Sequence, residues 1–108
     1  MRDDELMTEN DIQREIIDYL KARGYEVIRI NAGGYRGRTR LAPPGTPDVL
    51  ALGDNGQALW LEVKTATGTV SEAQAAWHER MRRRGHRVEV VRSVEEVEAI
   101  LYKTIDTL

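Results

Sequence analysis

The sequence contains no cysteine and only two histidines, His78 and His86. The absence of cysteine excludes disulfides and thiolate metal sites. Two histidines are too few for a histidine-rich zinc site. Any bound metal must therefore be held by oxygen ligands, which favours a hard divalent cation such as Mg2+ or Mn2+.

Long apolar runs are also missing from this chain of 108 residues, so no segment is expected to cross a membrane. The acidic and polar start, from Met1 to Glu5, is unlike a signal peptide. We therefore expect a soluble, cytoplasmic protein. The length fits one compact domain, residues 1–108, with a single modest core.

A strong net charge is absent too, because the formal charge is -2 at pH 7. The arginines nevertheless concentrate in two stretches, Arg36, Arg38 and Arg40 in a glycine-rich segment and then Arg80, Arg82, Arg83, Arg84 and Arg87. A locally basic surface can bind phosphates whatever the total charge is. A solvated arginine-rich face explains the same pattern equally well.

Helical and strand patterns alternate along the chain. Helices are predicted over residues 8–23, 71–84 and 93–101, and strands over residues 25–30, 49–52, 58–64 and 87–91. Thr8 and Asp11 suit the start of the first helix, and Ser71 and Gln74 form a capping box at the second. The order helix, three strands, helix, strand, helix predicts an α/β fold, a mixed β-sheet flanked by helices.

Three polar residues are expected to meet at one end of this sheet. Side chains alternate along a strand, so Glu62 and Lys64 share one face with Trp60. An Asn-Gly pair within residues 53–56 is a strong hairpin signal. Antiparallel pairing across that hairpin brings Asp48 beside Glu62 or Lys64. Two carboxylates can hold a divalent cation that activates water, and a lysine can stabilise developing negative charge. A plain salt bridge at a strand end is the alternative.

The same residues carry a family resemblance. Gly45-Thr46-Pro47-Asp48, followed by Glu62-Val63-Lys64, resembles the PD-(D/E)XK nuclease superfamily. More narrowly, the chain is similar to a stand-alone VRR-NUC (virus-type replication-repair nuclease) domain. A first-helix glutamate, a glycine-rich Asn-x-Gly loop with basic residues, and Ser71-x-x-Gln74 also match in order. The resemblance implies a restriction-endonuclease-like fold of order αβββαβα and a Mg2+- or Mn2+-dependent endodeoxyribonuclease that leaves a 5′-phosphate.

The resemblance also implies roles for single residues. Asp48 and Glu62 become the central metal ligands, the backbone carbonyl of Val63 a further ligand, and Lys64 the catalytic lysine. Gln74 is expected to hydrogen-bond near Lys64 or the attacking water, although simple helix capping explains it equally well.

The first-helix glutamate, expected to act on the metal through water, is either Glu9 or Glu15. At about 100° per residue, Glu9 lies along the apolar stripe of its helix, displaced toward the helix start, whereas Glu15 lies off that stripe. We therefore prefer Glu9, with Glu15 second. Electrostatic stabilisation of the helix start is the alternative role for Glu9.

Other polar and aromatic residues receive weaker interpretations. The DNA backbone is expected to meet Tyr35, Arg36, Arg38 and Arg40, unless they form only a mobile surface loop. His78 is interpreted as a surface residue, and Trp60 is expected to pack under the first helix. Trp77 and Met81 lie at helical spacing and are expected in the core.

Stand-alone relatives of this kind resemble Holliday-junction resolvases, which implies branched or four-way DNA as substrate. A symmetric junction suits a homodimer with two identical sites. The alternatives are a nuclease acting on duplex or flap DNA and a non-catalytic DNA-binding module with the same fold. The intact set of Asp48, Glu62 and Lys64 argues against the last of these.

Overall fold

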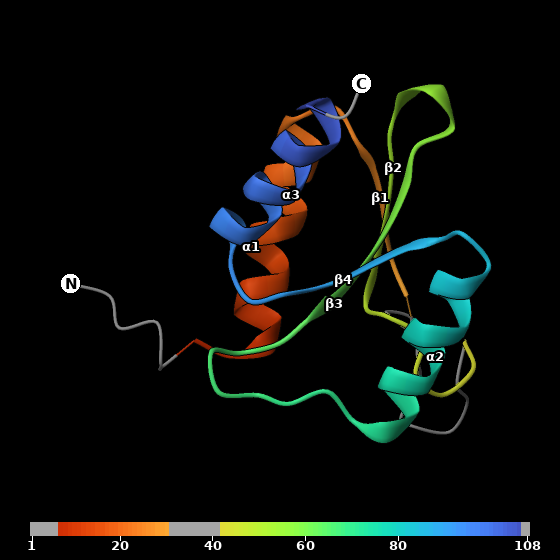
Figure 1. Cartoon of the computed structure of the whole chain (residues 1–108). Helices are drawn as coiled ribbons and strands as arrows, with labels where there is room; N and C mark the ends of the chain where they lie inside the picture. The colour runs from red at the N-terminus through yellow and green to blue at the C-terminus, as the bar shows by residue number, and fades with distance from the viewer. Residues whose placement is uncertain (1–6, 31–41, 107–108) are drawn as a thin grey trace.

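The computed structural model describes the backbone of residues 7–30 and 42–106 (Figure 1). The helices are α1 (Glu9–Ala22), α2 (Glu72–Arg83) and α3 (Val94–Asp106), and the strands are β1 (Glu26–Arg29), β2 (Val49–Leu52), β3 (Ala58–Val63) and β4 (Arg87–Val91). The predicted order of elements is confirmed, as is the α/β class. The main differences are that β1 is shorter than predicted and that α3 continues to Asp106.

The four strands form one mixed sheet in the order β1-β2-β3-β4. The first three strands are antiparallel neighbours, and β4 runs parallel to β3 after the crossover through α2. The predicted pairing of β2 with β3 is confirmed, with Val49 opposite Leu61. The Asn-Gly turn between them has Asn55 at φ 59° and Gly56 at φ 77°, the left-handed backbone that these residue types tolerate.

The helices lie on both faces of the sheet, with α1 and α3 on one face and α2 on the other (Figure 1). The main core lies between the sheet and the helices α1 and α3. Its buried members are Ile12, Ile16, Ile17, Leu20, Val49, Ala51, Leu59, Leu61, Val63, Val91, Val97 and Leu101. The predicted alternation along β3 therefore holds, because its leucines and Val63 are all in this core.

Trp60 lies on the opposite face, so its expected place under the first helix was wrong. Its ring packs edge-on against Trp77 of α2, with the ring centroids 5.3 Å apart. The physical reason is the alternation itself, since α1 covers the purely apolar face and leaves Trp60 and Glu62 to α2. Trp77 is buried as expected, and Met81 is half-buried.

The first helix starts as its sequence predicts. The Asp11 amide donates to Thr8 Oγ1 and the Thr8 amide donates to Asp11 Oδ2, each at 3.1 Å, which completes a reciprocal cap. Gly24 follows the helix at φ +92° and turns the chain into β1. Within the described residues, no helix is long and apolar enough to cross a membrane.

Candidate active site

Asp48 precedes β2 and is held by both neighbouring strands. The register of β2 on β3 places it opposite Glu62. The Val63 amide donates to Asp48 Oδ2 at 2.9 Å, and the Ile30 amide donates to the Asp48 carbonyl at 2.8 Å. The backbone thus fixes the aspartate from either side, and the sheet end carries the carboxylate pair expected from the hairpin.

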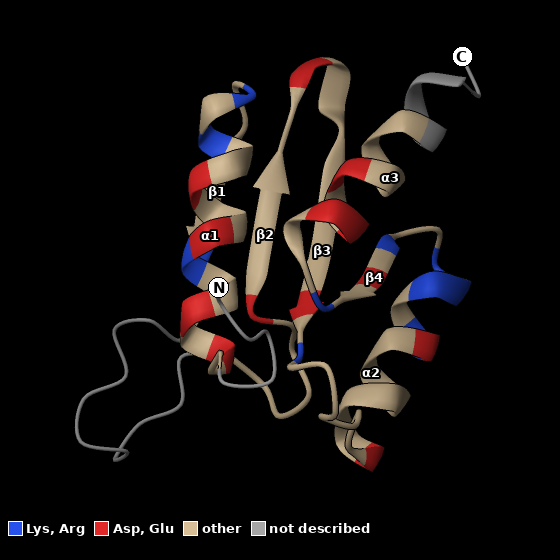
Figure 2. Ribbon diagram, turned by 90° about the vertical axis from the view of Figure 1, so that its left-hand side faces the viewer, with Lys and Arg blue, Asp and Glu red and all other residues tan. Residues whose placement is uncertain are grey.

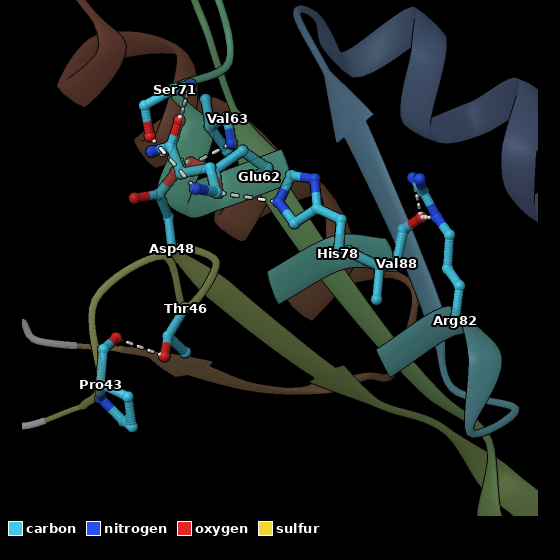
Figure 3. A network of polar contacts seen from close by, with 10 residues as sticks. Pro43, Thr46, Asp48, Glu62, Val63, Ser71, His78, Arg82 and Val88 are labelled. Atoms are coloured by element: carbon cyan, nitrogen blue, oxygen red, sulfur yellow. Dashed lines mark hydrogen bonds and ion pairs between the residues drawn. The ribbon is translucent and has the colours of Figure 1, made fainter. Parts of the chain in front are cut away.

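Glu62 is the most deeply buried acid of this site, with an exposed fraction of 1%. It points from β3 toward α2, where two side chains meet its carboxyl group (Figure 3). Gln74 Nε2 donates to Glu62 Oε2 at 3.2 Å, and His78 Nε2 lies 3.2 Å from Glu62 Oε1. Each carboxyl oxygen therefore has its own partner on α2.

Gln74 caps its helix, one of the two roles that the sequence left open, and its side chain also contacts Glu62. Its Oε1 accepts from the Ser71 amide at 2.9 Å, while the Gln74 amide donates to Ser71 Oγ at 3.2 Å, so the residue closes the capping box of α2. Its Nε2 is then turned toward Glu62. Capping and site contact use different atoms of one side chain and do not compete.

The surroundings of Glu62 disfavour its ionised form and raise its pKa from 4.5 to about 8. Burial is the largest cause, followed by the charge of Asp48 and a side-chain hydrogen bond with it, while the charge of Lys64 acts in the opposite direction. The half-buried Asp48 carboxylate and an ionised, buried Glu62 repel each other. A bound cation would remove that repulsion.

Lys64 follows β3 and is buried, with an exposed fraction of 8%. Its amide donates to the Val91 carbonyl at 3.0 Å, which extends the pairing of β3 with β4 by one residue. The loop after it is braced by Arg92, whose guanidinium donates to the Thr65 carbonyl at 2.5 Å and the Gly68 carbonyl at 2.7 Å. The lysine is thus anchored on both sides, next to the carboxylate pair.

His78 was expected at the surface, and this expectation was wrong. Its exposed fraction is 2%, and it lies on the face of α2 that contacts β3. Burial and the positive charges of Arg82 and Lys64 lower its pKa, so the neutral ring is favoured. A usable signal was present in the sequence, because His78 follows Gln74 by four residues and shares its helix face.

The sequence model described as the VRR-NUC domain matches residues 38–95, just over half of the chain. The chain belongs to the VRR-NUC family. It is therefore a nuclease-type domain, and nucleases of this family are generally metal-dependent. No match is found among curated proteins.

Several solved structures resemble this VRR-NUC domain, and two of them are compared with it. One, titled "VRR_NUC domain", is 28% identical with a TM-score of 0.70, and the alignment covers 89% of this chain and 97% of the other. The second, titled "VRR_NUC domain protein", is 18% identical with a TM-score of 0.67, covering 93% of this chain and 89% of the other. The second likeness concerns the fold alone.

The VRR-NUC domain sets the distance between α2 and the carboxylates through a close backbone contact. A Cβ on Gly45 would lie 2.3 Å from the Ala73 carbonyl oxygen and 3.2 Å from Trp77 Cβ. Gly45 also has φ +89°, which an L side chain rarely adopts. Only glycine lets the segment before Asp48 pack against the first turn of α2.

We expect Gly45→Ala to destabilise the domain by about 2 kcal/mol more than Gly85→Ala does. Gly85 is the matched control, because it has φ +94° but nothing within 4 Å of an added Cβ. Backbone strain is then common to both variants, and the clash with α2 is specific to the first. Urea denaturation of both variants measures the difference, and equal losses would contradict the role assigned to the contact.

Glu9 is the first residue of α1 and is exposed, not buried at the end of the apolar stripe. The buried stripe begins only at Ile12, one turn into the helix. The charge of Glu9 nevertheless reaches Glu62 and contributes to its raised pKa. Glu15 lines a separate pocket with Ala66 and Arg92, between the starts of α1 and α3.

The described part of the VRR-NUC domain contains no group of three Asp, Glu, His or Cys side chains close enough to hold a metal ion together. The pair Asp48 and Glu62 still fits a hard divalent cation. Both side chains offer oxygen, both are oriented by hydrogen bonds, and their repulsion raises the Glu62 pKa. A cation there would offset the cost of a negative charge on buried Glu62 beside Asp48.

Figure 2 shows acidic residues where β2 begins and β3 ends, and basic residues toward the C-terminal end of α2. Arg80, Arg83 and Arg84 are exposed there. Arg82 is exposed too, but its guanidinium donates to the Val88 carbonyl at 3.0 Å and 2.7 Å, which ties α2 to β4. The predicted DNA-contacting residues Tyr35, Arg36, Arg38 and Arg40 lie outside the described residues.

Proposed function

We propose that this VRR-NUC domain is a DNA endonuclease that uses Mg2+ or Mn2+ to hydrolyse phosphodiester bonds. One observation carries the proposal: the carboxyl groups of half-buried Asp48 and buried Glu62 meet beside Lys64 at one end of the sheet. When both groups are ionised, such an arrangement is costly to the fold unless a cation binds there. A salt-bridged structural site has no need of two converging acids.

Each residue has a chemical task in this proposal. Asp48 and Glu62 hold the metal, with the Val63 carbonyl as a further ligand and Glu9 acting from the start of α1. A cation held there would supply Lewis-acid chemistry, which polarises a phosphate and lowers the pKa of a water. Lys64 positions the attacking water and stabilises the negative charge that develops on the phosphate. Gln74 orients Glu62 through its amide.

We propose branched DNA, such as a four-way junction, as the substrate, cut by a homodimer with one site on each subunit. The twofold symmetry of a junction matches that of a dimer. Tyr35, Arg36, Arg38 and Arg40 are proposed to contact the backbone near the scissile phosphate, because arginine forks suit phosphate oxygens. These contacts position the DNA without reading its sequence.

Cleavage of matched four-way, flap and duplex substrates, each with Mg2+, Mn2+ or EDTA, tests this proposal. We expect cleavage with metal only and at least about tenfold faster cleavage of the four-way junction, which corresponds to a preference of 1.4 kcal/mol or more. Equal rates on all three substrates would contradict junction selectivity while keeping the nuclease. Binding without cleavage under every metal condition would favour a non-catalytic DNA-binding module.

A further inference from the structure

His78 is a buried histidine that the proposed chemistry does not use. It lies one helical turn after Gln74 on α2, so both side chains face β3. Its Nε2 lies 3.2 Å from Glu62 Oε1, and the Gln74 amide donates to the other oxygen at the same distance. Each oxygen of the Glu62 carboxyl group is therefore contacted by one side chain of α2.

Other contacts fix the orientation of the Gln74 and His78 side chains. The Ser71 amide holds Gln74 Oε1 at 2.9 Å, so only the NH2 end of that amide can turn to Glu62. His78 in turn is packed edge-on beside the Trp77 ring, at 6.4 Å between centroids, and is almost completely buried. Neither side chain is free to follow Glu62 if the carboxylate rotates.

A carboxylate oxygen can accept more than one contact. With one contact on each oxygen from α2, the remaining positions of the carboxyl group face Asp48, with which Glu62 shares a side-chain hydrogen bond in the metal-free protein. A carboxylate held at one oxygen only is free to rotate about its terminal torsion, which is broad for glutamate. Ligands oriented in advance bind a metal more tightly than ligands that must first be ordered.

We propose that His78 is a positioning residue that donates its Nε2–H to Glu62 and, together with Gln74, fixes that carboxylate for metal binding. The inference rests on the proposed function, because it assumes that Glu62 is a metal ligand. His78 has no contact with the metal or the DNA in this proposal. Its effect on catalysis is exerted through Glu62.

Titration calorimetry with Mn2+ alone, without DNA, tests the proposal on four proteins: wild type, His78→Leu, His78→Gln and His86→Leu. Leucine fills the buried position with an apolar side chain and removes the donor, whereas the glutamine amide can replace the Nε2–H donor. We expect His78→Leu to weaken Mn2+ binding by about 10- to 100-fold and His78→Gln by less than about threefold. His86 is exposed, and its variant should bind like wild type.

Nitrogen-15 NMR of histidine in the metal-free wild-type protein gives a second readout that does not depend on any variant folding. We expect the neutral His78 ring to carry its proton on Nε2. A proton on Nδ1, equal Mn2+ affinity of His78→Leu and wild type, or an equal loss in His78→Gln and His78→Leu would each overturn the positioning role. If wild type binds no Mn2+, the proposed function fails together with this inference; if only the variants behave otherwise than expected, the inference fails alone.

Discussion

Replacing Lys64 with alanine should lower the rate of DNA cleavage by about 10²- to 10³-fold while the domain stays folded. The lysine lies beside two carboxylates, so its charge is positioned to stabilise the phosphate during attack. It is not proposed as a metal ligand. Mn2+ affinity should therefore stay the same or increase, because a positive charge near the cation is removed.

Single-turnover cleavage of the preferred substrate measures this effect, with circular dichroism to check the fold. Lys21→Ala is the matched control, because Lys21 is exposed in the last turn of α1. Loss of activity in Lys64→Ala together with loss of Mn2+ binding would point to a structural role. Unchanged cleavage would remove Lys64 from the proposed chemistry.

Replacing Glu62 with glutamine should stabilise the metal-free domain at high pH and strongly reduce its stabilisation by metal. The pKa of Glu62 is raised to about 8 in the folded protein, against 4.5 ordinarily. Between these pH values the folded state keeps a proton that the unfolded state has released. Stability therefore falls as the pH rises from about 4.5 to about 8.

Glutamine cannot ionise, so Glu62→Gln should lose this slope. Above pH 8 the variant should exceed the wild-type free energy of unfolding by on the order of 3 kcal/mol. Urea denaturation in EDTA across this pH range measures it, and Glu98→Gln on the exposed side of α3 is the control. A slope that persists in Glu62→Gln would show that another group carries the pH dependence.

The response of Glu62→Gln to added Mn2+ tests whether Glu62 takes part in metal binding. Wild type should gain stability with metal concentration by mass action, because only its folded state has the assembled site. Glu62→Gln should gain much less, since it lacks one of two charged ligands. A metal that stabilises both proteins equally would place its binding site elsewhere.

Much of the fold follows from local patterns that tertiary contacts did not overrule. The alternation along residues 58–63 separated the core leucines from Glu62, and the Asn-Gly turn set the pairing that brings Asp48 to that strand. The capping pair Ser71 and Gln74 marked the start of α2 within one residue. Each of these depends on residues close in sequence, where period and turn chemistry act directly.

The predictions for Trp60 and His78 were wrong because both depend on which helix covers which face of the sheet. The residues around Trp60 do not indicate whether α1 or α2 packs on it. Because α1 packs on the apolar face of the sheet, Trp60 contacts α2. His78 was misjudged for the same reason, since its helix is polar in composition and only the sheet beneath buries one side of it. The preference for Glu9 over Glu15 stays a prediction, since Glu9 is exposed and only its charge contributes to the raised pKa of Glu62.

The sequence by itself determined that this protein lacks thiolate chemistry, has two acids and a lysine at the ends of paired strands, and resembles a VRR-NUC nuclease. Only the tertiary structure decided how Glu62 is held. The crossover from β3 through α2 to β4 lays that helix across the carboxylate face, and Gly45 allows its close approach. Gln74 and His78 then reach the two oxygens of Glu62, because the burial of one side of a helix is a property of the assembled layers rather than of the helix itself.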